Sequence, residues 1–416
     1  MRNSPFWLII IALMLLLDFY VFQAIKTVSQ SAGHRTRSII FISYWAISLS
    51  ALLVFCLLPF LTLDNFSKGF RTIMFALIVG LFFAKLAAAV FLLVDDIRRV
   101  IQWMAGKLFF SNTEGEQLQE GERITRSVFL SWIGLGVGGG ILASLINGFS
   151  NKYDYHIRTL PLKFNSLPQA FKNLRIVQVS DIHCGSFNNK QAVLKGVEKI
   201  MKLKPDIILF TGDLVNNRAD EMVDYMDVFN QLKAPMGVYS TLGNHDYGDY
   251  EQWESRAKKE ENLERLKQIH GELGWKLLMN EHVIFERNSE KIAVIGIENW
   301  SAKARFPKYG KMPQAYAGVE NIPFKILMSH DPSHWDAEVR TSYPDIDLML
   351  AGHTHGMQFG IELPWFKWSP VQYVYKQWAG LYEEKNQKLY VNRGFGFIGY
   401  PGRVGILPEI TLIELA

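Results

Sequence analysis

Four long apolar stretches fill most of the first 150 residues, and they limit what this chain can fold into more than any other feature. Each holds the roughly 20 residues that a helix needs to cross a bilayer of about 30 Å. A cleaved signal peptide fits the first stretch poorly because Asp18 interrupts it, and four such helices in succession are unusual in a soluble domain. The sequence therefore predicts a transmembrane module over residues 1–150, with helices at about 6–25, 39–61, 70–94 and 128–149.

Two ionisable residues, Asp18 and Lys85, lie inside these apolar stretches. A charge within a membrane span indicates a functional site by default. The alternative is a residue at a helix end, or one that faces the helix bundle, whose side chain reaches water. The sequence favours this alternative for Asp18 and leaves both interpretations open for Lys85.

The distribution of lysine and arginine predicts the orientation of the module, because cytoplasmic loops carry an excess of both. The segments after the first and third apolar stretches hold eight of these residues, and the opposite side holds six. The eight are Lys26, Arg35, Arg37, Arg98, Arg99, Lys107, Arg123 and Arg126; the six are Arg2, Lys68, Arg71, Lys152, Arg158 and Lys163. We therefore expect a multi-pass membrane protein whose residues after 150 lie outside the cytoplasm.

Charge and cysteine content exclude two other classes of protein. The net charge of +4 is small and dispersed, which argues against a nucleic-acid partner and is compatible with a protein lying against anionic lipid. Cys56 and Cys184 are the only cysteines, so a disulfide framework is excluded.

After residue 172 short apolar runs alternate with charged, helix-like stretches, which is typical of an α/β domain. Helices are expected at 191–203 and 251–273, and a connector at 151–171 because Pro161 and Pro168 oppose regular structure. The expected strands are 174–179, 207–210, 237–242, 292–297, 325–328, 346–350, 388–391 and 410–415.

Five of these strands are followed at once by Asp, Asn or His. One such ending would be a helix cap or a turn. In α/β sheets, however, ligands bind beyond the carboxyl ends of strands, so five endings predict one polar cluster at a sheet edge. Its candidate metal ligands are Asp181, His183, Asp213, Asn244, His330, His353 and His355.

This set of carboxylate, amide and imidazole groups, without thiolate, suits Mn, Fe or Zn. Seven ligands are too many for one ion, whereas two ions that share a bridging carboxylate account for all of them. Two neighbouring metal ions promote displacement at phosphorus and generate hydroxide at neutral pH. The sequence therefore predicts two divalent metal ions, with Mn favoured.

In order along the chain, the motifs D-x-H, G-D, G-N-H-D, a lone H and G-H-x-H resemble those of the calcineurin-like metallophosphoesterases. The resemblance covers about residues 172–416 and implies a two-sheet α/β/β/α sandwich. It also implies that Asp213 bridges the two metals, with Asp181, His183 and His355 on the first. Asn244, His330 and His353 would complete the second. By the same resemblance His245 would stabilise or protonate the leaving oxygen, and Asp246 would orient its ring.

Within that family the chain is similar to a membrane-anchored bacterial branch that ends in an N-R-G-F-G-like motif, here residues 392–396. Arg393 of this motif is a candidate contact for the substrate phosphate, with a structural ion pair as the alternative. Met357 replaces a glycine that follows the last metal motif in that branch, and Gln358 beside it is a second candidate substrate contact.

Aromatic residues alternate with lysines at 363–368 and 373–378. This pattern is typical of a membrane interface, and a small aromatic core under a long loop is the alternative. The predicted function is a membrane-anchored phosphoesterase that hydrolyses phosphodiester or pyrophosphate bonds of a phosphorylated small molecule or lipid by metal-activated hydroxide. A UDP-diacylglucosamine-type pyrophosphatase of lipid A synthesis and a non-catalytic membrane sensor or scaffold are the alternatives. The oligomeric state is not predicted.

Overall fold

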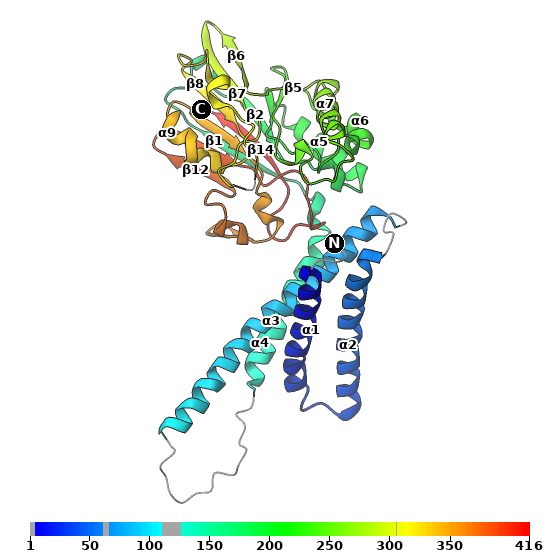
Figure 1. Cartoon of the computed structure of the whole chain (residues 1–416). Coiled ribbons are helices and arrows are strands. Elements are labelled where there is room, and N and C mark those ends of the chain that lie inside the picture. Colours follow the sequence, from blue (N-terminus) through cyan, green and yellow to red (C-terminus); the bar gives the residue numbers. More distant parts are fainter. Residues whose placement is uncertain (1–4, 61–65, 110–125, 305) are drawn as a thin grey trace, which may run out of the picture. The chain divides into compact units, whose positions relative to one another are not determined.

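The computed structural model describes residues 5–60, 66–109, 126–304 and 306–416. The chain divides into two compact units, Met1–Asn147 and Gly148–Ala416 (Figure 1). Each unit has its own architecture and its own hydrophobic cores.

The first unit holds four helices that are long and apolar enough to cross a membrane. They are α1 (Pro5–Val28), α2 (His34–Leu57), α3 (Lys68–Phe109) and α4 (Val128–Gly148). Large apolar side chains such as Leu8, Ile42 and Phe129 are exposed on them, as expected where lipid is the solvent. Leu61, the expected end of the second stretch, and Arg2 and Arg123 of the orientation count lie outside the described residues.

The third helix is longer than the sequence pattern predicted. The apolar stretch ends near residue 94, but α3 continues to Phe109, so its 42 residues extend over about 63 Å. That is about twice the thickness of the hydrocarbon core. Charged residues after Val94 therefore continue the helix instead of ending it.

The two ionisable residues inside the apolar stretches contact each other in the bundle interior. Lys85 of α3 forms an ion pair with Asp18 of α1, and its ammonium also donates to the hydroxyl of Ser48 of α2, at 2.7 Å. All three are buried. Asp18 therefore faces the bundle, as expected, but it pairs with Lys85 instead of reaching water.

The second unit is built on two six-stranded sheets, with strand orders β1-β14-β2-β3-β4-β5 and β12-β13-β9-β8-β7-β6. β10 and β11 form a separate hairpin. The strands are β1 (His156–Leu162), β2 (Arg175–Val179), β3 (Ile207–Phe210), β4 (Val238–Ser240), β5 (Lys276–Leu277), β6 (Glu281–Arg287), β7 (Glu290–Gly296), β8 (Phe324–Met328), β9 (Leu348–Ala351), β10 (Ile361–Leu363), β11 (Phe366–Trp368), β12 (Gly380–Glu384), β13 (Gln387–Val391) and β14 (Glu409–Leu415).

Alternate residues of these strands point into three apolar layers. Ile176 of β2 and Ile326 of β8 belong to a core between the two sheets. Val177 and its neighbours face α5 (Lys190–Lys202), α6 (Met226–Phe229) and α7 (Arg256–Glu272) on one outer side. Leu327 and its neighbours face α8 (Met312–Tyr316) and a π-helical turn at Trp335–Val339 on the other; α9 (Arg340–Ser342) follows directly. The fold is thus the expected α/β/β/α sandwich.

The expected connector at 151–171 is wrong in part, because it contains β1. This strand pairs in parallel with β14, from His156 opposite Glu409 to Leu162 opposite Leu415. It lies at the edge of its sheet, where Pro161 removes no ladder hydrogen bond that the sheet needs.

Candidate metal centre

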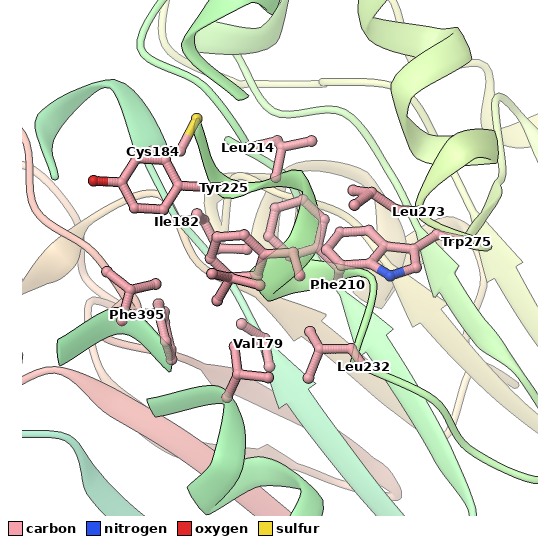
Figure 2. Packing of buried hydrophobic residues seen from close by; sticks show 14 of the residues in the cluster. Val179, Ile182, Cys184, Phe210, Leu214, Tyr225, Leu232, Leu273, Trp275 and Phe395 are labelled. Carbon is pink, nitrogen blue, oxygen red and sulfur yellow. The ribbon is translucent and has the colours of Figure 1, made fainter. Parts of the chain in front are cut away.

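The loops that carry the predicted ligands begin where strands end, and buried neighbours anchor them. Asp181 and His183 follow β2 and alternate with Ile182 and Cys184, which are both buried in the core. Leu214, next to Asp213, is buried in the same core. Figure 2 shows Ile182, Cys184 and Leu214 within the hydrophobic cluster that also contains Val179 and Phe210 at the ends of β2 and β3. The core therefore fixes the backbone from which the ligands project.

Asp181, His183 and His355 form a first group of potential ligands, with ligand atoms all within 4.8 Å of one another. His355 Nε2 lies 3.2 Å and His183 Nε2 4.0 Å from Asp181 Oδ1. All three side chains are buried.

Asp213, His330 and His353 form a second group of the same kind. His330 Nε2 lies 3.1 Å from Asp213 Oδ2, and His353 Nδ1 lies 3.3 Å from His330 Nε2. Asn244 adds its Oδ1 at 2.7 Å from His353 Nδ1, while its amide nitrogen donates to the Tyr250 hydroxyl. The predicted second ligand set is thus brought together, with Asn244 presenting its oxygen.

One oxygen of Asp213 lies between the two groups. Its Oδ2 is 3.5 Å from His183 Nε2 and 3.1 Å from His330 Nε2. Its Oδ1 accepts a hydrogen bond of 2.9 Å from the backbone N–H of His245. This contact turns one oxygen away and leaves the other to face both groups, which is the arrangement that a bridging carboxylate requires.

The protonation of these residues fits divalent cations. Both ring nitrogens of His183 and Nε2 of His355 are buried without a hydrogen-bond partner among the described residues. Such burial costs free energy unless these nitrogens bind a metal ion. Burial lowers the pKa of His183, His353 and His355 and so favours the neutral imidazole that binds metal.

His330 differs from the other three histidines. Burial opposes its charge, but the neighbouring Asp213 carboxylate outweighs burial and raises the pKa of His330 to about 10. A cation that binds between these two residues must therefore displace a proton.

Contacts behind the ligands select the ring nitrogen that each histidine presents. His330 Nδ1 lies 2.8 Å from the Thr211 carbonyl, which leaves Nε2 facing Asp213. His353 Nε2 lies 2.8 Å from the hydroxyl of Tyr375, which in turn donates to Asp331 Oδ2 at 3.1 Å. A proton on His353 Nε2 completes this series of hydrogen bonds and leaves Nδ1 free to bind metal.

A fully buried arginine, Arg403, supports His355 from behind. Its Nη2 lies 3.2 Å from His355 Nδ1, and its Nη1 donates to the Arg393 carbonyl at 2.7 Å and contacts the His355 carbonyl at 3.3 Å. Arg403 thus connects the N-R-G-F-G segment to the last metal loop.

Two glycines are required by close approach of the chain to the ligands. A Cβ atom on Gly243 would lie 2.2 Å from Asp213 Oδ1, and one on Gly352 would lie 2.2 Å from Asp181 Oδ2. Any side chain at either position would displace a ligand carboxylate.

The expected role of Asp246 is corrected. Its carboxylate accepts backbone N–H groups of Asp213, Leu214 and Gly243, each at 2.8 Å, and so ties the second metal loop to the third. The carbonyl of Asn216 holds the ring of His245 instead, at 2.8 Å from Nδ1. The other nitrogen of His245 is therefore the one that can act on a substrate, and the ring centroid lies 5.0 Å from that of His183.

The two candidate substrate contacts are also corrected. Arg393 is buried and paired with Glu409 and Glu362, each at 2.6 Å, so the structural alternative holds. Gln358 is buried too. Its amide nitrogen donates to the carbonyls of Tyr400 and Gly402, and its oxygen accepts the N–H of Ile398. Both residues stabilise loops, whereas Met357 is exposed.

The residues that support the candidate ligands were not predicted from the sequence, among them Asn216, Tyr375 and Arg403. Asn216 acts through its backbone, which carries no sequence signal. Tyr375 lies in the aromatic segment 373–378, and the sequence pattern does not distinguish it from the other aromatic residues there. A lone buried arginine near the C-terminus gives no local pattern either.

Comparison with known proteins agrees with this geometry. Residues 1–152 match a family model described as "Probable Calcineurin-like phosphoesterase, transmembrane domain", and residues 174–357 match one described as "Calcineurin-like phosphoesterase".

Among curated relatives, a zebrafish (Danio rerio) "Transmembrane protein with metallophosphoesterase domain" is 31% identical over 60% of this chain and 54% of its own length. The chain thus spans about half the length of that relative. The Bacillus subtilis "Uncharacterized metallophosphoesterase YkoQ" is 27% identical over 64% of this chain and 92% of its own length.

A third relative is the "UDP-2,3-diacylglucosamine pyrophosphatase LpxG" of Chlamydia trachomatis. It is 30% identical over 58% of this chain and 84% of its own length. Together with two matched family models and two groups of potential metal ligands, these relatives show that the chain is a membrane protein of the calcineurin-like phosphoesterase family.

Proposed function

We propose that this protein is a membrane-anchored phosphoesterase that hydrolyses phosphodiester or pyrophosphate bonds with the help of two divalent cations, Mn²⁺ being favoured. The observation that carries the proposal is the position of Asp213 Oδ2 between His183 and His330. A carboxylate oxygen shared by two buried ligand groups suits two cations a short distance apart, and such pairs assist phosphoryl displacement.

When bound, the cations would neutralise the charge of the substrate phosphate and lower the pKa of a water molecule. The protein's own contribution is to hold the ligands in place before the substrate arrives, through the backbone contacts of Asp213, Asp246 and His330. His245 is half-buried and held by the Asn216 carbonyl through Nδ1, so its Nε2 can donate a proton to the departing oxygen.

We further propose that the substrate is a phosphorylated lipid or small molecule on the extracytoplasmic side. The lysine and arginine count of the loops supports this side, and the membrane module supports a substrate that resides in the bilayer. The similarity to LpxG favours a second candidate, a pyrophosphatase of the UDP-diacylglucosamine type. A cytoplasmic nucleotide sugar would conflict with the proposed orientation, so this candidate ranks second.

The geometry of the site argues against a non-catalytic sensor. A domain that only senses a phosphorylated ligand needs neither the complete ligand set nor a positioned proton donor. Here all seven predicted ligands converge, and His245 is retained beside them.

Activity of the purified full-length chain tests the proposal. With Mn²⁺ it should hydrolyse bis(p-nitrophenyl) phosphate, and Asp213→Asn should lose both activity and bound metal, measured by elemental analysis. His245→Ala should lower kcat by about 100-fold or more and keep its metal, since a proton donor contributes about 10²–10⁴ in rate.

His156→Ala is the matched control, because His156 is an exposed histidine on β1 that belongs to neither group of candidate ligands. It should retain wild-type activity. Full turnover by both site variants would refute the assigned site, and no turnover by the wild type with Mn²⁺, Fe²⁺ or Zn²⁺ would favour the sensor.

A further inference from the structure

The β10–β11 hairpin turns its charged face toward the domain and its apolar face outward. Glu362 and Lys367 pair across the strands, and Ile361 and Leu363 pair with Trp368 and Phe366 on the other face. Glu362 accepts hydrogen bonds from Arg393 and Arg158, and Lys367 contacts the Ala379 carbonyl. A hairpin of a water-soluble domain shows the reverse alternation, with the apolar face packed inside.

The outward face is part of a larger apolar surface. Trp365 at the hairpin tip is 81% exposed, and Tyr373, in the next segment of the chain, is 77% exposed. We define the docking surface as Ile361, Leu363, Trp365, Phe366, Tyr373 and Val374, all of which are exposed. The hairpin meets the next segment where Trp368 Nε1 donates to the Tyr373 hydroxyl at 3.4 Å, and apolar side chains gathered in this way indicate an interaction site.

The neighbouring aromatic residues do form a small core, so both interpretations of this segment hold for different residues. Val371, Tyr375, Trp378 and Ala379 are buried against Ile406. Tyr373 and Val374 lie within the same segment and yet point outward. The exposed side chains therefore lie beside a buried cluster to which they do not belong.

We propose that the docking surface inserts into the interfacial layer of a lipid bilayer. The composition suits this occupant, because tryptophan and tyrosine concentrate at the level of lipid headgroups and Lys376, which is exposed, attracts anionic lipid. The connection suits it as well. Only residues 149–155 separate the end of α4 from β1, and seven residues extend at most about 25 Å. The domain is thus always within reach of the bilayer.

Three contacts connect the segment that follows the hairpin, which carries Tyr373 and Val374 of the docking surface, to the candidate metal centre. Ser369 donates to the Gly356 carbonyl at 2.8 Å, Thr354 donates to the Trp378 carbonyl at 2.6 Å, and Tyr375 lies 2.8 Å from His353. A bilayer held at this surface brings phosphates of its own lipids close to the ligand loops. The expectation that such phosphates are substrates rests on the proposed function, whereas the docking does not.

Spin labelling of the full chain tests docking without any assay of activity. In a Cys56→Ala/Cys184→Ala background, a nitroxide is attached at Trp365→Cys or Tyr373→Cys, and the protein is reconstituted in vesicles of phosphatidylcholine and phosphatidylglycerol. Both labels should collide more often with oxygen than with a water-soluble nickel chelate. Val223→Cys is the matched control, since Val223 is an apolar residue that is 69% exposed outside the surface, and its label should show the reverse.

Equal access of the nickel chelate to the labels at 365, 373 and 223 would overturn the proposal. Spin–spin broadening at 365 that disappears when the protein is diluted with unlabelled chain would assign the surface to a second copy and would also overturn it. Two label sites keep the test valid if one variant fails to fold.

A second experiment tests the link to the substrate. The Trp365→Glu/Tyr373→Glu variant in vesicles should hydrolyse a lipid-borne pyrophosphate at least 10-fold more slowly than the wild type and hydrolyse bis(p-nitrophenyl) phosphate at the same rate. An equal loss on both substrates would contradict a role in lipid access. No activity of the wild type on either substrate would contradict the proposed function and leave the spin-label result standing.

Discussion

Five of the candidate metal ligands share a backbone conformation that most residues avoid. Asp181, His183, Asp213, His353 and His355 all have φ between 48° and 70°, in the left-handed region. Each such residue costs on the order of 1–3 kcal/mol, and Asp, Asn and His tolerate the region best among residues with a side chain. The buried neighbours Ile182 and Leu214 stabilise the loops in this state. Ligand chemistry and backbone conformation therefore select the same residue types at these positions.

Tyr375 should control metal affinity although it is not a ligand. Its hydroxyl joins His353 Nε2 to Asp331, and removal of such an outer contact weakens metal binding by about 10–100-fold. We expect Tyr375→Phe to weaken binding of one of two Mn²⁺ ions by at least 10-fold in isothermal titration calorimetry. Tyr373→Phe, two residues away and exposed, is the control and should bind both ions normally. Equal affinities in the two variants would contradict the role of the hydroxyl.

His270, outside the metal centre, should make the domain sensitive to acid. It is fully buried on α7, neither ring nitrogen has a hydrogen-bond partner among the described residues, and burial lowers its pKa to about 3. The folded state therefore keeps it neutral while the unfolded state gains a proton below pH 6.5. Its contribution to the free energy of unfolding should thus fall by about 1.4 kcal/mol per pH unit between 6.5 and 3.

Thermal unfolding of the wild type and His270→Leu at several pH values measures this effect. As the pH falls from 7 to 4.5, the melting temperature of the wild type should decrease relative to that of His270→Leu. A difference that does not change with pH would show that His270 is charged or solvated in the folded state.

The candidate ligands that the structure brings together could be predicted from the sequence because each follows an apolar strand. The supporting residues could not, since their contacts join distant parts of the chain. Arg403 meets His355 across 48 residues, and Asp331 meets Tyr375 across 44. The role of Arg393 was left open for the same reason, because its partners Glu362 and Glu409 approach it only when the domain folds.

At the level of elements, prediction succeeded where both faces of a strand are buried. All eight expected strands occur, with ends shifted by one or two residues, and α5 lies within one residue of its expected bounds. The missed strands are β1, β5, β6, β10, β11 and β12, which lie at sheet edges, next to edges or in the hairpin. Such strands carry polar residues or proline, so that their hydrophobic pattern resembles that of loops.

The ion pair of Asp18 and Lys85 should hold three membrane helices together. Removal of one partner leaves an uncompensated buried charge, which destabilises a protein by about 3–5 kcal/mol. We expect Lys85→Met to lower the melting temperature of the full chain in detergent. The double variant Asp18→Leu/Lys85→Met should recover most of the loss, because both charges are then absent. Failure of the double variant to recover would indicate that the pair does more than join α1 to α3.

At the level of the whole molecule, the length of α3 bears on orientation. Arg98, Arg99 and Lys107 lie on its extension beyond the apolar stretch, and Asp95 and Asp96 pair with Arg98 and Arg99 there. Lysines and arginines near the end of a span set the orientation, whereas acidic residues contribute little. Pairing with Asp95 and Asp96 therefore does not remove Arg98 and Arg99 from the count of basic residues on this side. The proposed cytoplasmic side therefore remains the side of this extension and of the turn between α1 and α2.

Labelling of membrane vesicles decides which side the catalytic unit occupies. In the Cys56→Ala/Cys184→Ala background, Val223→Cys reports on the catalytic unit, and Ser31→Cys reports on the turn between α1 and α2, where Ser31 is exposed. An impermeant maleimide should label position 223 in right-side-out vesicles and position 31 only in inside-out vesicles. Three spans, α2, α3 and α4, lie between the two positions, and an odd number of crossings places them on opposite sides of the membrane. The reverse pattern would place the metal centre in the cytoplasm. The proposed pyrophosphatase activity would then rank first.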